Sequence, residues 1–140
     1  KNCVCLAGYE LELSRMLKTG SDVWLNNPRL YREASGTSGM TASMNGSVNL
    51  SIQDGWMPEY GTAENSFLLP MIPSADMPLN EQDDFDGNNL HDIMEKQVVS
   101  MYYDQPEKWA ELVKTNITTV SPQFDSDRMA DEYYKLMYNS

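Results

Sequence analysis

A run of small residues and glycines, Glu33-Ala34-Ser35-Gly36-Thr37-Ser38-Gly39-Met40, carries the side chains of this sequence best suited to ligand chemistry. Glycines and small side chains let backbone N–H groups approach a ligand closely, and a helix that begins behind them attracts anions, phosphate above all. The carboxylate of Glu33 can accept hydrogen bonds from sugar hydroxyls. The hydroxyls of Ser35, Thr37 and Ser38 can donate to phosphate oxygens. The residues alone indicate either a site for an anionic or phosphorylated ligand or a glycine-rich turn from strand to helix.

Alternating strands and helices are expected around this run. The pattern predicts strands at 3–7, 21–25, 48–52 and 66–69, a helix at 9–19, and a helix after the glycine-rich run. The strand at 48–52 shows the alternation of apolar and polar residues that is typical of a half-buried strand. The strand, helix and strand within 3–25 suggest a βαβ unit. We therefore expect an α/β fold with a partial Rossmann-like parallel sheet over 1–70, whose ligand loops follow the carboxyl ends of the strands.

The second half of the chain is predicted to be an acidic, turn-rich loop at 71–89 followed by helices at 90–140 that pack on the same domain. Pro106 suits a first helical turn, and Asp125 or Ser126 can cap the last helix. Three apolar stripes at helical spacing are expected to be core. They are Leu90, Ile93, Met94, Val98 and Met101; Trp109, Leu112, Val113, Ile117 and Val120; and Met129, Tyr133, Leu136 and Met137.

The charge of the chain argues against two classes of partner. Among 140 residues, 21 are acidic and 10 are basic, which gives a net charge of −11 and no basic run. Nucleic acid and anionic membrane surfaces are therefore excluded as expected partners, and no apolar stretch approaches the roughly 20 residues of a membrane span. We expect a cytoplasmic protein. Four acidic and five basic residues lie within 1–50, so the glycine-rich run lies in the least acidic part of the chain, as phosphate favours.

Several weaker signals favour structural roles. Cys3 and Cys5 are expected to be reduced and packed as small hydrophobes. Asp84-Phe85-Asp86-Gly87-Asn88 resembles part of a calcium loop, but its glycine falls too early, so a solvated acidic loop is favoured and no metal site is expected. His91, at a helix start, has no second ligand nearby. Trp56 either lines a sugar subsite or is buried, and burial is favoured.

Three further motifs accompany the glycine-rich run in order. They are Gly20-Ser21-Asp22-Val23-Trp24-Leu25-Asn26-Asn27-Pro28-Arg29, Asn45-Gly46 and Asp54-Gly55-Trp56. Together the motifs resemble the C-terminal part of the α-glucan (glycogen, starch and maltodextrin) phosphorylases, most of all the shorter bacterial type. The resemblance implies a GT-B glycosyltransferase with two Rossmann-like domains, which transfers glucosyl units between α-1,4-glucan and phosphate, with glucose 1-phosphate as the product.

The resemblance also implies roles for individual residues. Glu33, with the backbone of Ala34, Ser35 and Gly36, would hold the glucosyl unit, and Thr37 with Ser38 would contact the phosphate of pyridoxal phosphate. The partners implied are α-glucan and phosphate or glucose 1-phosphate, and a homo-oligomer is compatible with the sequence. No catalytic residue is assigned.

The sequence departs from this family at Thr41. The family has a lysine here that forms a Schiff base with pyridoxal phosphate, and a hydroxyl cannot form that imine. The departure leaves three interpretations open: a nucleotide-sugar glucosyltransferase of the glycogen-synthase type, a degenerate site, or a cofactor held without a covalent bond. A non-catalytic glucan-binding or regulatory module is a further hypothesis.

The chain is expected to be a piece of a longer protein. It begins at Lys1, and the resemblance starts part-way through a Rossmann-like domain. We therefore expect the N-terminal part of the longer protein to be a partner of this chain, and the 140-residue chain alone to be inactive.

Overall fold

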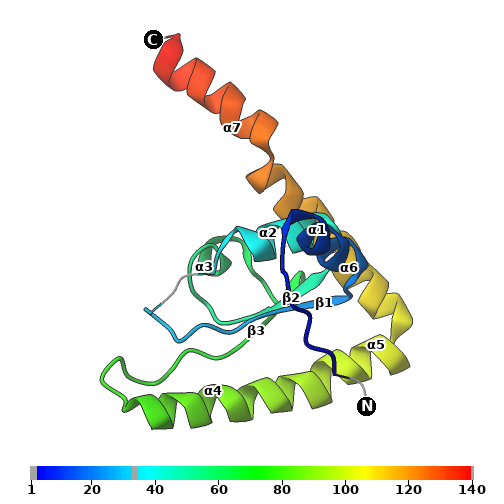
Figure 1. Cartoon of the computed structure of the whole chain (residues 1–140), viewed down its shortest axis with the longest axis vertical. Helices are drawn as coiled ribbons and strands as arrows, with labels where there is room; N and C mark the ends of the chain where they lie inside the picture. Colours follow the sequence, from blue (N-terminus) through cyan, green and yellow to red (C-terminus); the bar gives the residue numbers. More distant parts are fainter. Residues whose placement is uncertain (1–2, 33–34, 140) are drawn as a thin grey trace.

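The computed structural model of the chain describes residues 3–32 and 35–139. A three-stranded parallel sheet lies at its centre, in the order β1-β2-β3 (Figure 1). The strands are β1 (Val23–Asn26), β2 (Val48–Ser51) and β3 (Ser66–Leu68). Leu25 of β1 is paired with Leu50 of β2, which is paired with Phe67 of β3. The expected α/β class and parallel sheet are confirmed.

Helices connect and cover these strands. α2 (Thr37–Met44) connects β1 to β2, and α3 (Met57–Tyr60) connects β2 to β3. α1 (Leu11–Gly20) precedes the sheet. The helices after the sheet are α4 (Leu79–Ile93), the π-helical turns η1 (Met94–Val99), α5 (Ser100–Asp104), α6 (Pro106–Phe124), α7 (Ser126–Tyr133) and η2 (Tyr134–Tyr138). α6 begins at Pro106 and Asp125 caps α7, as the sequence predicts.

The central strand is buried on both faces, and its two faces differ in chemistry. Val48 and Leu50 are fully buried in the main apolar core, together with Ile93 and Val98 of the α4–η1 segment. The side chain of Asn49 lies on the other face, where it contacts α2. Because side chains alternate along a strand, this one strand joins an apolar layer to a polar contact with the helix.

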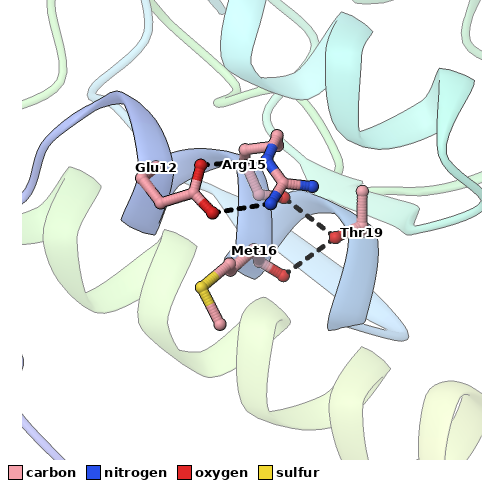
Figure 2. Close-up of polar contacts among 4 residues, drawn as sticks. All are labelled: Glu12, Arg15, Met16 and Thr19. Atoms are coloured by element: carbon pink, nitrogen blue, oxygen red, sulfur yellow. Dashed lines mark hydrogen bonds and ion pairs between the residues drawn. The ribbon is translucent and has the colours of Figure 1, made fainter.

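Side-chain contacts within α1 support this helix. Arg15 makes two hydrogen bonds to the carboxylate of Glu12, and the hydroxyl of Thr19 bonds to the carbonyl oxygens of Arg15 and Met16 (Figure 2). Leu11 and Met16 of the same helix are exposed. The helix predicted at 9–19 is therefore present, shifted by one or two residues.

The predicted strand at 3–7 is wrong. These residues are irregular and exposed, and Cys3 and Cys5 carry free, exposed thiols rather than packed ones. An apolar pattern specifies a tendency to extend, but a strand forms only when a neighbouring strand supplies its hydrogen bonds. The βαβ unit predicted within 3–25 is absent for this reason, and the βαβ units that form are β1-α2-β2 and β2-α3-β3.

The acidic segment 71–89 is not wholly a loop, because α4 begins at Leu79. Asp84–Asn88 therefore lie within a helix, which cannot wrap around a cation as a calcium loop does. His91 is exposed near the end of α4 rather than at a helix start. The buried side chain of Gln82 donates to the carbonyl oxygen of Met77, just before the helix begins.

The last of the three predicted core stripes is wrong as well. α7 and η2 extend away from the rest of the molecule (Figure 1). Leu136 is 75% exposed and Met137 is 64% exposed. The first two stripes do pack, since Ile93, Val98, Leu112 and Val120 are buried. Helical spacing defines an apolar face, whereas the tertiary structure decides whether another element covers it. Among the described residues, no helix is both long and apolar enough to span a membrane.

Candidate functional site

The loop that follows β1 returns to the sheet at its carboxyl edge, where three polar side chains meet. The side-chain amide of Asn26, the last residue of β1, donates to the hydroxyl of Ser35 at 2.6 Å and to that of Ser51 at 3.4 Å. The two hydroxyl oxygens lie 3.3 Å apart, and Ser51 also donates to the carbonyl oxygen of Ile52. Ser35 is 5% exposed. Its hydroxyl is therefore used inside the protein, where it supports the loop that leads into α2.

The turn after β2 contacts and stabilises this loop. The carboxylate of Asp54 accepts from the backbone N–H of Gly55 at 2.7 Å and from that of Tyr31 at 3.1 Å. Tyr31 has a φ of 62°, which a non-glycine residue rarely adopts. Asp54 therefore joins the loops that follow two neighbouring parallel strands, and it stabilises an unusual backbone conformation in the first of them.

A charged contact ties the same loop to α4. Arg29 binds the carboxylate of Asp83 through two hydrogen bonds of 2.7 and 2.6 Å. The hydrogen bond from Arg29 lowers the pKa of the Asp83 carboxyl, and the same contact raises the pKa of Arg29. The two side chains are about half exposed, so solvent screens the pair and its role is mainly to orient the loop.

The first turn of α2 begins next to this loop, and its backbone N–H groups have no acceptor within the helix. Gly36 is the N-cap residue and provides no side-chain cap. Thr37 is exposed and Ser38 is partly exposed, so both are accessible at this turn. The structure thus brings Ser35, Gly36, Thr37 and Ser38 together at the carboxyl edge, where the sequence predicts a ligand. Their roles in binding stay predictions. Glu33 and Ala34 lie outside the described residues.

A close contact with β2 sets the position of α2. Asn49 is fully buried and donates to the carbonyl oxygen of Gly39 at 3.0 Å and to the hydroxyl of Ser43 at 2.7 Å. A Cβ at Gly39 would lie only 2.7 Å from the side-chain oxygen of Asn49. Glycine is thus needed for this close approach of helix to strand.

Thr41 lies one helical turn after Thr37 in α2 and is exposed. Its hydroxyl donates to the carbonyl oxygen of Thr37 at 3.0 Å, and its own carbonyl accepts from the side chain of Asn45 at 2.8 Å. Anchoring pyridoxal phosphate as an imine requires a primary amine, and this position offers a hydroxyl bonded within its own helix. The residues at the carboxyl edge therefore do not fit a covalently attached pyridoxal phosphate.

Residues that the sequence leaves without a role support the site. Asn26, Ser51 and Asp54 position the loop, although the motif comparison assigns them no contacts. One signal in the sequence points to them, namely polar residues at or just after the carboxyl ends of two predicted strands.

Trp56 is not a sugar platform. It is 5% exposed and packs edge-to-face on Phe124, with ring centroids 5.2 Å apart. The favoured interpretation of burial is confirmed.

A surface depression of about 640 Å³ lies at the opposite, amino edge of the sheet, lined in part by Gly20, Asn45, Gly46 and Trp109. It is therefore separate from the candidate site.

Comparison with known proteins identifies relatives. No family model matches the chain. Over 140 residues the chain is 38% identical to a glycogen phosphorylase of Mycobacterium tuberculosis, a match that covers 95% of this chain and 16% of that protein. It is 37% identical over 132 residues to a maltodextrin phosphorylase of Thermococcus litoralis, covering 94% of this chain and 16% of that protein. The chain is a relative of the α-glucan phosphorylases.

The resemblance to α-glucan phosphorylases that the motifs predict is thus confirmed along almost the whole chain. The chain spans only 16% of the length of these two phosphorylases. It is also 41% identical over 140 residues to an uncharacterized protein of Methanocaldococcus jannaschii, of which it covers 25%.

Proposed function

We propose that the chain is the segment of an α-glucan phosphorylase-like glucosyltransferase that supplies the loop around residues 33–38 to the glucosyl and phosphate groups. The observation that carries the proposal is the 38% identity to a glycogen phosphorylase over 95% of the chain. The position of the loop at the carboxyl edge of a parallel sheet supports it, because ligands of such sheets bind at that edge.

The proposed contacts divide the loop into two parts. Glu33 and the backbone of Ala34, Ser35 and Gly36 hold the glucosyl unit, whereas Thr37 and Ser38 contact phosphate. The inward hydrogen bond of the Ser35 hydroxyl fixes the loop that carries Gly36 and Thr37. The amides of the first turn of α2 support phosphate, since a helix N-terminus stabilises anions.

The proposed reaction exchanges one glycosidic oxygen for another. The bond between C1 of the terminal glucosyl unit and the O4 of the next glucose breaks, and a bond from C1 to a phosphate oxygen forms. The proton that phosphate gives up is transferred to the departing O4, so glucose 1-phosphate and a shortened α-1,4-glucan result. The chain contributes one wall of the cleft, and the remaining part of a longer polypeptide supplies the other. We therefore expect no activity from the 140 residues alone.

Thr41 favours a second candidate function. A nucleotide-sugar glucosyltransferase of the glycogen-synthase type requires no imine, and the diphosphate of its donor would occupy the place of two separate phosphate groups. Pyridoxal phosphate is the cofactor that the resemblance implies for the first candidate, but Thr41 cannot anchor its aldehyde.

Two assays on the longer protein that contains this chain distinguish the candidates. Formation of glucose 1-phosphate from glycogen and phosphate is the expected result. Transfer of glucose from a nucleotide sugar to glycogen, without glucose 1-phosphate formation, would support the synthase. Glycogen binding with neither activity would support a non-catalytic module and contradict both transferases.

A binding experiment on the chain itself tests the location of the site. Titration of isotope-labelled chain with glucose 1-phosphate is expected to shift the amide NMR signals of Gly36, Thr37 and Ser38. The variant Thr37→Ala is expected to weaken this response. The control variant Thr118→Ala should not, because Thr118 is an exposed helical threonine that lines the amino-edge depression, away from the candidate site. Shifts confined to the amino-edge depression would contradict the proposed location.

A further inference from the structure

The residue at position 41 is the difference between this chain and a site that binds pyridoxal phosphate covalently. We infer that the chain forms no site-specific imine with pyridoxal phosphate at this loop, and that the replacement of an amine by the Thr41 hydroxyl is by itself responsible. The inference rests on the proposed function for the identity of the loop. Chemical labelling of lysine by pyridoxal phosphate tests it directly, without a measurement of enzyme activity.

Both polar groups of Thr41 are engaged within α2. Its hydroxyl donates to the carbonyl oxygen of Thr37, and its carbonyl accepts from Asn45. An imine forms when a primary amine attacks the aldehyde carbon and water leaves, and a hydroxyl group has no nitrogen for that product. Thr41 therefore acts as an ordinary helical residue that bonds back to the preceding turn.

Lysines elsewhere in the described residues do not replace the missing amine. Four of them have their ammonium groups next to acceptors three or four residues earlier in the chain: Lys96 on Asp92, Lys108 on Gln105, Lys114 on Glu111 and Lys135 on Asp131. Lys18 lies in α1, and its carbonyl oxygen accepts from Ser47 at the amino edge of the sheet.

Lys114 lies at the other end of α2. It lines the amino-edge depression together with Asn45 and Gly46, which follow the last turn of α2. The first turn of α2, at Thr37, lies at the carboxyl edge. The carboxyl edge therefore has no lysine from the described part of the chain.

Packing does not require threonine at position 41. The side chain is exposed, so a longer side chain meets no buried neighbour. Residues four apart lie on the same face of a helix, so a lysine at this position would share its exposed face with Thr37. Restoring the amine is thus expected to change the chemistry of the loop and to leave its fold intact.

Borohydride trapping tests the inference on the chain. Wild type, Thr41→Lys and the matched control Thr118→Lys are each incubated with pyridoxal phosphate, reduced and mapped by peptide mass spectrometry. In wild type, slow labelling is expected over several exposed lysines, with no protection by inorganic phosphate. The variant Thr41→Lys is expected to gain one additional adduct, at the introduced amine, that phosphate suppresses. Thr118→Lys should gain no phosphate-sensitive adduct.

Two results would overturn the inference. One is stoichiometric, phosphate-protected labelling of a single lysine in wild type, which would identify another anchor. The other is a folded Thr41→Lys variant that is labelled no more than Thr118→Lys, which would show that more than position 41 has been lost. Circular dichroism confirms folding in each case. Failure of the proposed function appears separately, as the absence of glucose 1-phosphate formation by the longer protein.

Discussion

The backbone of Gly55 lies directly against the backbone of Ser35. A Cβ at position 55 would lie 2.5 Å from the carbonyl oxygen of Ser35 and 2.9 Å from its amide nitrogen. Gly55 also has a φ of +61°, in the left-handed region that favours glycine. The turn after β2 thus supports the candidate ligand loop by direct contact between two backbones, which leaves room for no side chain.

Replacing Gly55 by alanine should therefore lower the free energy of unfolding by roughly 2 kcal/mol or more, because strain and overlap add. The control is Gly87→Ala in the interior of α4, where a Cβ has nothing within 4 Å. That variant should be more stable than wild type by roughly 0.5–1 kcal/mol, since alanine favours helix. Urea denaturation measures both, and equal stabilities would contradict the contact.

Asn49 is predicted to hold α2 on the sheet. The variant Asn49→Ala removes the donors to the carbonyl oxygen of Gly39 and the hydroxyl of Ser43, and it leaves a cavity. Loss of these bonds at a fully buried site should lower the free energy of unfolding by about 2–3 kcal/mol. Hydrogen exchange should become faster in α2 than in α6. Uniform acceleration throughout the chain would argue against a local role.

The ion pair between Arg29 and Asp83 is expected to make the stability of the fold decrease in acid. The Asp83 carboxyl has a pKa below its ordinary value when folded, mainly through its hydrogen bond from Arg29. The stabilisation is therefore present above the ordinary pKa of an aspartate and is lost as pH falls through the lowered folded pKa. Asp83→Asn should reduce the thermal midpoint at neutral pH and flatten its decline in acid.

The control for this prediction is Asp84→Asn. Among the described residues, no ion pair involves the exposed neighbour Asp84. Its removal should leave the acid dependence as in wild type. The same thermal melts at a series of pH values serve both variants, and an unchanged profile for Asp83→Asn would refute a folded-state contribution from this pair.

Two leucines from the predicted core stripes should respond very differently to truncation. Leu112 in α6 is 6% exposed, and Leu136 in η2 is 75% exposed. Leu112→Ala should cost about 2–5 kcal/mol of stability through lost burial and a residual cavity. Leu136→Ala should change the stability by less than about 0.5 kcal/mol. A large loss for Leu136→Ala would mean that α7 and η2 are covered in solution.

Local patterns predicted much of the fold around the site. The alternation at Val48–Ile52 and the proline that starts α6 each act through a few neighbouring residues, so the sequence reveals them. The same applies to the glycine-rich loop that leads into α2. The acidic residues at 79–89 obscured a helix, because their composition is also typical of a solvated loop.

By itself, the sequence determined the parallel α/β class, the family resemblance and the absence of an amine at Thr41, since these depend on residue identity and short-range periodicity. Only the tertiary structure decided that Ser35 bonds inward to Asn26 and Ser51 and that Gly55 lies against it. It also decided that the segment 3–7 and α7 are exposed. Pairing and burial depend on partners distant in the chain, and a one-dimensional pattern does not specify which partners are present.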